Sequence, residues 1–154
     1  MRPLIVYLSY HHGNTEIIAR TIAESLGAEL VMCPDVDCES LARYDLIGFG
    51  SGIYFGQHHR CLLALAERLP ASPGKSAFIF STAGYPRQMS RWHGPLKERL
   101  QKKGYVISGE FCCKGFDTYG PFRFIGGINK GRPNETDIIT AKSFARDLKM
   151  DREI

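Results

Sequence analysis

The sequence has no long hydrophobic run, and its cysteines lack the spacings of a disulfide framework. No stretch approaches the roughly 20 apolar residues that a helix needs to cross a bilayer. The five cysteines are odd in number, contain no C-x-x-C motif and belong to a chain that is not small. The apolar stretch Leu4–Leu8 is too short for a signal peptide. We therefore expect a cytoplasmic protein with reduced thiols and no membrane span.

Several motifs of common enzyme and binding classes are missing as well. The chain has neither G-x-x-x-x-G-K-[ST] nor G-x-G-x-x-G, which disfavours magnesium–nucleotide hydrolysis and dinucleotide binding. No cysteine is followed by arginine six residues on, so a low-molecular-weight phosphatase is excluded. The His11-His12 and His58-His59 pairs lack zinc-ligand spacing, and we expect no metal site. The net charge of +4 is spread over scattered residues, so nucleic acid is not an expected partner.

What the sequence does contain is a regular alternation of short apolar runs and helical periodicity. Buried strands are expected over Leu4–Leu8, Ala28–Met32, Leu46–Gly50, Ala77–Ser81 and Tyr105–Cys113. Helices are expected over Asn14–Leu26 (capped by Asn14), Gln57–Leu69 and Ser90–Lys103, with a last one after an Asn134–Asp137 capping box. Strands alternating with helices predict βαβ units. The fold class is therefore α/β: a doubly wound, three-layer sandwich with a five-stranded parallel sheet, in one domain over residues 1–154.

Ligands of such sheets bind outside the carboxyl ends of the strands, where the strand order reverses. The loop after the first strand, Ser9 to Thr15, combines small hydrogen-bonding side chains with Gly13 and precedes a helix N-terminus. Unpaired helix amides and the helix dipole make such a turn an anion cradle. The loop contains no Lys or Arg, which suits a phosphate that stays bound. The alternative is an ordinary polar turn.

The loops after the third and fourth strands carry aromatic residues among glycines and hydroxyls. In Gly50 to Gly56, the rings of Tyr54 and Phe55 could stack on a flat ligand or fill the core, and we favour stacking for Tyr54 and a core position for Phe55. Ser81 to Pro86 pairs hydroxyls with another aromatic and suits the rim of a planar heterocycle, although a surface turn fits equally well. All three loops should converge on one sheet edge.

At these residues the sequence resembles the flavodoxin family. Ser9, Gly13 and Thr15 match the phosphate pattern [ST]-x-x-x-G-x-T of that family, and the segment Gly126 to Asn134 is similar to one in flavodoxin-domain proteins. The resemblance implies a flavodoxin-like fold with sheet order 2-1-3-4-5, an FMN cofactor and a role in electron transfer. Its FMN-binding positions would be Ser9, Tyr10, His11, Gly13, Asn14 and Thr15 in the first loop, Ser51, Gly52, Ile53, Tyr54 and Phe55 in the second, and Ser81, Thr82, Ala83, Gly84 and Tyr85 in the third.

Two features of this sequence bear on which function it has among proteins that resemble flavodoxins. The chain is basic, and two histidine pairs adjoin the predicted flavin loops, so we expect positive potential that eases two-electron reduction. The stretch Gly50 to His59 also resembles the flavodoxin-like protoporphyrinogen oxidases. The alternative function is therefore an FMN-dependent oxidoreductase acting on a quinone or a protoporphyrinogen. No catalytic residue is assigned in either case.

The segment Lys114–Pro133 shows little periodicity. Structureless loops of that length in compact domains are usually functional. It is either a packed insertion, or a flap or docking surface for a partner. Expected partners are a redox protein or a small-molecule electron donor or acceptor. The sequence is also compatible with a homodimer. The cysteines Cys61, Cys112 and Cys113 are interpreted as packing residues.

Overall fold

The computed structural model describes residues 1–10, 13–84, 86–115 and 131–153. The strands are β1 (Pro3–Leu8), β2 (Glu29–Met32), β3 (Leu46–Tyr54), β4 (Gln57–His58), β5 (Ser76–Ala83) and β6 (Val106–Lys114). The α-helices are α1 (Asn14–Leu26), α2 (Arg60–Arg68), α3 (Met89–Lys102) and α4 (Glu135–Glu153). Short 3₁₀ turns are η1 (Cys33–Asp35), η2 (Cys38–Arg43) and η3 (Pro86–Gln88). None of the helices within these ranges is long and apolar enough to span a membrane.

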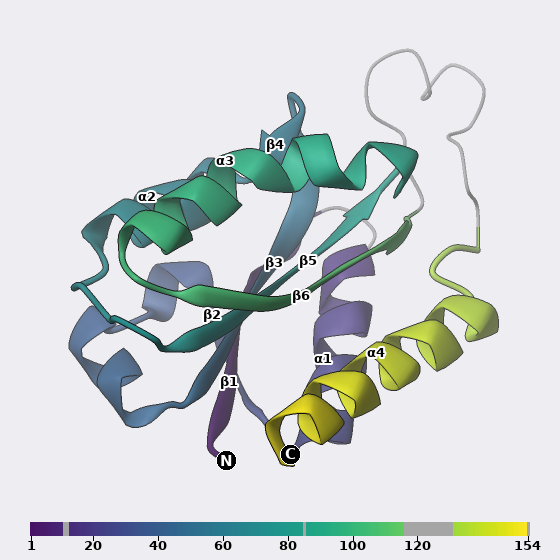
Figure 1. Ribbon diagram of the computed structural model, residues 1–154. Helices are drawn as coiled ribbons and strands as arrows, with labels where there is room; N and C mark the ends of the chain where they lie inside the picture. Colours follow the sequence, from purple (N-terminus) through teal and green to yellow (C-terminus); the bar gives the residue numbers. More distant parts are fainter. Residues whose placement is uncertain (11–12, 85, 116–130, 154) are drawn as a thin grey trace.

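One sheet organises these elements. Its order is β2-β1-β3-β5-β6 with all neighbours parallel, and β4 pairs antiparallel with the end of β3. The five parallel strands therefore follow the predicted order 2-1-3-4-5. Helices α2 and α3 cover one face and α1 and α4 the other (Figure 1). The doubly wound three-layer sandwich predicted from the sequence is confirmed.

Each face of the sheet has its own apolar core. Side chains of β1, β3 and β5 that point toward α2 and α3 form one core with Leu62, Leu65 and Leu96. Alternate side chains of the same strands form the other core with Ile18, Ile22 and further residues of α1 and α4. Strands buried on both faces are the reason that β1, β3 and β5 appear in the sequence as continuous apolar runs.

Glycines in β3 make room for aromatic rings from β5. Gly48 lies opposite Phe78 and Gly50 opposite Phe80 in the parallel register. A Cβ added at either glycine would overlap the facing ring. The rings of Phe78 and Phe80 are fully buried. The predicted third strand is glycine-rich because its neighbour fills the volume of the missing side chains.

Two predicted boundaries around β3 are wrong. The strand continues to Tyr54 rather than ending at Gly50, and α2 begins at Arg60 rather than at Gln57. Between them Phe55 and Gly56 form a two-residue hairpin turn with φ of 53° and 78°. Positive φ at both central residues is the geometry that matches the twist of paired strands. The hairpin is formed by residues that the sequence pattern assigned to a loop and to a first helical turn.

Helix α1 has the predicted bounds, but its cap differs from the prediction. Asn14 is the first helical residue, and Gly13 occupies the N-cap position with φ 66°. Glycine reaches this left-handed conformation at little steric cost. The Ser9 hydroxyl accepts a hydrogen bond from the amide of Glu16 at 3.1 Å, so a residue of the preceding loop satisfies a first-turn donor. Asn14 is therefore not the cap.

The start of α4 agrees with its predicted capping box. The amide of Asp137 donates to Asn134 Oδ1 at 3.1 Å, and the amide of Asn134 donates to Asp137 Oδ2 at 2.8 Å. Arg132 adds a bidentate contact, with Nη2 2.6 Å from Asp137 Oδ1. Burial alone would raise the pKa of Asp137, but the hydrogen bonds from Arg132 and the Asn134 amide, together with the positive charges of Arg132 and Lys114, lower the pKa overall. A buried carboxylate thus anchors the helix start.

Replacing Arg132 by Gln should lower the free energy of unfolding by about 1–2 kcal/mol, because it leaves the Asp137 carboxylate without its charged partner. Arg20→Gln is the matched control, since the Arg20–Glu16 ion pair is exposed and should contribute less than about 0.5 kcal/mol. Urea unfolding measures both. Equal losses in the two variants would contradict this role of Arg132.

Candidate functional site

The described residues of the three predicted loops lie at the carboxyl edge of the sheet, the edge at which β3, β5 and β6 end in Figure 1. The hydroxyls of Thr15, in the first turn of α1, and Thr82, near the end of β5, lie 2.9 Å apart and are both buried. Gly115, which follows β6, donates its amide to the carbonyl of Ala83 at 3.1 Å. The Asn14 side chain packs against Gly115. The first and third loops are therefore joined by direct hydrogen bonding and packing.

The turn after β1 has the donors that a phosphate needs. Ser9 accepts from the Glu16 amide through its oxygen, which leaves the hydroxyl proton available for donation. A Cβ built at Gly13 would meet no described atom within 4 Å, so the described part of the chain leaves that side of the turn open. The Thr15 hydroxyl lies at the same helix start, where the dipole is positive. The neutral donor set fits a phosphate group.

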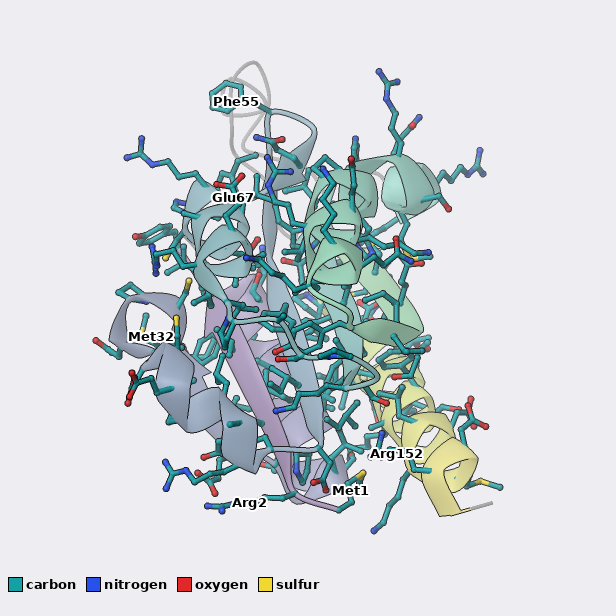
Figure 2. The ribbon with its side chains drawn as sticks, turned by 60° about the vertical axis from the view of Figure 1, so that its left-hand side comes forward. Met1, Arg2, Met32, Phe55, Glu67 and Arg152 are labelled. Atoms are coloured by element: carbon teal, nitrogen blue, oxygen red, sulfur yellow. The ribbon has the colours of Figure 1, made fainter. Side chains whose placement is uncertain are left out.

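The second loop is the β3–β4 hairpin, and it places its two aromatic residues differently. Phe55 is 89% exposed at the tip of the hairpin, where Figure 2 shows it pointing away from the body of the protein. The preference for a core position of Phe55 is therefore wrong, because a residue in a two-residue turn has no core beneath it. Tyr54 is partly buried one residue earlier. Trp92 of α3 lies beside Gly56.

His59 connects the first and second loops, a contact that sequence reasoning missed. The centroid of its ring lies 5.4 Å from the ring centroid of Tyr10 and 5.2 Å from that of Tyr54. Its amide donates to the Ser51 hydroxyl at 3.0 Å, and that hydroxyl donates to the Gly52 carbonyl at 2.6 Å. Ser51 thus uses its side chain to fix the hairpin. Tyr10, Tyr54 and His59 form an aromatic group beside the turn after β1.

Ser81 belongs to a buried polar network that the sequence did not predict. The Ser81 hydroxyl lies 2.7 Å from His93 Nε2, His93 Nδ1 lies 3.1 Å from Glu110, and Lys97 lies 3.1 Å from the other oxygen of Glu110. A carboxylate only accepts hydrogen bonds, so His93 donates one from Nδ1 to Glu110. Its Nε2 then accepts a hydrogen bond from the Ser81 hydroxyl. Ser81 and His93 are fully buried. The network therefore joins β5, α3 and β6 and does not present a nucleophile to a substrate.

His58 is the second buried histidine of this region. Its Nε2 lies 3.0 Å from the Phe80 carbonyl, and its ring lies 4.9 Å from that of His93. Within the described ranges its Nδ1 is buried without a hydrogen-bond partner. Burial and the neighbouring His93 lower the pKa of His58 to about 3, and burial and Lys97 lower that of His93 to about 4.

These protonation states correct one expectation from the sequence. Burial also lowers the pKa of His59, with Arg60 adding to the shift. Both members of the His58-His59 pair are therefore mainly neutral at pH 7, and the positive potential predicted from this pair is wrong. The other pair, His11-His12, lies outside the described residues. So do Tyr85 and residues 116–130, which include most of the segment Lys114–Pro133.

Two surface hollows lie away from this edge. One, of about 480 Å³, is lined by Glu67, Glu98, Arg99, Lys102 and Lys103 at the ends of α2 and α3. The other, of about 430 Å³, is lined by Met1, Leu26, Asp45, Lys149 and Arg152 at the amino end of the sheet. Figure 2 shows Met1 and Arg152 at the opposite end of the molecule from Phe55. Charged side chains dominate both hollows, and neither has the aromatic or hydroxyl lining of the carboxyl edge.

Comparison with known proteins places this geometry in a family. The model of the flavodoxin domain matches residues 4–108. An uncharacterised protein of Methanocaldococcus jannaschii is 50% identical over 148 residues, which cover 96% of this chain and 98% of that protein. Among solved structures, oxidised flavodoxin 2 from Bacillus cereus superimposes with a TM-score of 0.74 at 21% identity, covering 98% of this chain and 99% of that one. A flavodoxin from the domain Archaea gives 0.68 at 16% identity over the whole of both chains. This chain belongs to the flavodoxin family.

Proposed function

We propose that this protein binds FMN at the carboxyl edge of its sheet and transfers electrons through it. Membership of the flavodoxin family implies a flavin cofactor. The observation that carries the proposal is the Thr15–Thr82 hydrogen bond, which joins a lysine- and arginine-free turn to the loop after β5. The whole chain, residues 1–154, would act as one domain in this role.

The proposed phosphate group would be held by Ser9, Gly13, Asn14 and Thr15, with His11 as a further candidate. Hydroxyls and amides at a helix start bind an anion without a full positive charge. A charge-assisted hydrogen bond from a neutral donor is stronger than an ordinary one. The Thr82 hydroxyl supports this arrangement by fixing the orientation of Thr15.

The flavin ring would lie between the second and third loops. Tyr10 and Tyr54 supply the aromatic faces, with His59 holding both rings in place. Backbone of Ser51 to Phe55 and of Ser81 to Tyr85 would line the ring. When bound, FMN supplies one- and two-electron transfer chemistry.

An electron carrier is favoured over an enzyme by the exposure of this edge. Phe55 is 89% exposed and Tyr10 is 52% exposed. Exposed aromatic side chains beside the site suit transient docking of a redox partner protein. Turnover with NAD(P)H and a quinone or a protoporphyrinogen would instead support the FMN-dependent oxidoreductase.

Thr15→Val should weaken FMN binding by about 10–100-fold, because it removes a hydroxyl that donates to a charged group. Thr21→Val is the matched control: Thr21 lies on the same helix, is also buried, and donates to the carbonyl of Ile17. Fluorescence titration of each purified apoprotein with FMN gives the two dissociation constants.

The control variant should bind FMN within about twofold of the wild type, because its hydroxyl lies more than a turn from the phosphate site. Equal losses in both variants would indicate a general effect on α1. Unchanged affinity in Thr15→Val would remove Thr15 from the proposed phosphate site.

A further inference from the structure

A pair of cysteines outside the candidate flavin site lies in direct contact. Cys33 is the first residue of η1, after β2, and Cys61 lies in the first turn of α2. Their Sγ atoms are 2.7 Å apart, although 28 positions separate the residues in sequence. The elements that carry them pack against each other. The contact is therefore built by the tertiary fold.

The surroundings give the two thiols different accessibility. Cys33 is 2% exposed, within the core beneath α2, whereas Cys61 is partly exposed. Burial raises the pKa of Cys33, and the hydrogen bond with Cys61 adds to the shift. Cys61 is held by a hydrogen bond from its own amide to His59 Nδ1 at 3.0 Å. A reagent in solution can therefore reach Cys61 first.

We infer that Cys33 and Cys61 form a reversible disulfide, a second redox site independent of the flavin. A disulfide bond is about 2.05 Å long, so roughly 0.7 Å of approach joins the two sulfurs. The oxidant is a small-molecule disulfide of the glutathione class. The partly exposed Cys61 is the entry point, and the buried Cys33 is the resolving thiol.

The exchange balances in two steps. Cys61 loses its proton and attacks one sulfur of the external disulfide, which forms a mixed disulfide and releases one thiol. Cys33 then loses its proton and attacks Cys61 Sγ, which forms the internal bond and releases the second thiol. In total the chain gives up two electrons and two protons, and one external disulfide becomes two thiols.

The third nearby cysteine, Cys38, provides the matched control. It begins η2 and packs at the edge of the same apolar core. It lies close enough to Cys33 to make a small contribution to the raised pKa of that thiol. Cys38→Ser should leave the disulfide intact, while Cys61→Ser should abolish it. Both replaced side chains are partly exposed, and far-UV circular dichroism checks that the two variants fold alike.

The test equilibrates the full chain with mixtures of reduced and oxidised glutathione, then alkylates the denatured protein for mass spectrometry. The reduced protein should take five labels, one for each cysteine. The oxidised protein should take three and yield a Cys33–Cys61 linked peptide. Because the bridge closes a long loop, the midpoint of thermal unfolding should rise by about 10 °C.

Five labels at every glutathione ratio would overturn the inference, as would a linkage that includes Cys38 or one that survives Cys61→Ser. The measurement is made with and without FMN. A protein that fails to bind FMN but forms the Cys33–Cys61 bond would contradict the proposed function and leave this site standing.

Discussion

Gly50→Ala should lower the free energy of unfolding by about 3 kcal/mol or more, one of the largest single effects expected in this protein. The added Cβ would overlap the ring of Phe80, which faces Gly50 across the β3–β5 pairing and is fully buried. Overpacking a rigid core typically costs 1–3 kcal/mol, and here the ring has no solvent into which to move. Chemical denaturation measures the loss.

Gly52→Ala is the matched control in the same strand. Its added Cβ would meet the hydroxyl end of Tyr54 at 3.2 Å, and that side chain is partly exposed and can shift. We expect a change of less than about 1 kcal/mol. Adding Phe80→Leu to Gly50→Ala should recover at least about 1 kcal/mol relative to additivity. Strictly additive losses would show that Gly50 and Phe80 do not share this space.

The second large effect is an acid-induced loss of stability caused by two buried histidines. The pKa values of His58 and His93 are lowered to about 3 and about 4, against about 6.5 in an unfolded chain. Between these limits the unfolded state binds more protons than the folded state, so stability falls as the pH falls. Above about pH 6.5 the two histidines give no pH dependence. Below it, the loss should approach roughly 2–3 kcal/mol per pH unit near pH 5.

Variants separate this effect from the titration of carboxylates. His93 faces Ser81, Glu110 and Lys97, and His58 faces His93 and the Phe80 carbonyl. His93→Gln should halve the slope of stability against pH between 6 and 5, and the double variant with His58→Gln should nearly remove it. Urea unfolding at several pH values measures the slope. A wild-type protein equally stable at pH 5.5 and 7.5 would contradict the protonation states described above.

The sequence predicted the sheet because its strands are buried on both faces. Continuous apolar runs such as Leu4–Leu8 are compatible with few structures other than central parallel strands. The capping box at Asn134 was recognisable because its hydrogen bonds are local. Helical periodicity failed at Gln57, where the hairpin turn at Phe55-Gly56 reverses the chain. A positive φ at a phenylalanine is uncommon and carries no sequence signal.

The long-range contacts of the site were beyond sequence reasoning. The contact of His93 with Ser81 and that of Cys33 with Cys61 join residues 12 and 28 positions apart. The first depends on how α3 packs on the sheet and the second on how α2 packs against η1, and no spacing rule specifies such packing. The Thr15–Thr82 bond, by contrast, follows from the rule that carboxyl ends of parallel strands share one edge, and the three-loop prediction anticipated that juxtaposition.

A comparison of FMN with riboflavin, which lacks the phosphate, tests directly whether the protein binds a phosphate group at the start of α1. Because the phosphate held by the turn from Ser9 to Thr15 should contribute much of the binding energy, fluorescence titration of the wild-type apoprotein should show FMN binding at least about 100-fold more tightly than riboflavin. Equal affinities for the two flavins, or no binding of FMN, would contradict a phosphate site at the start of α1.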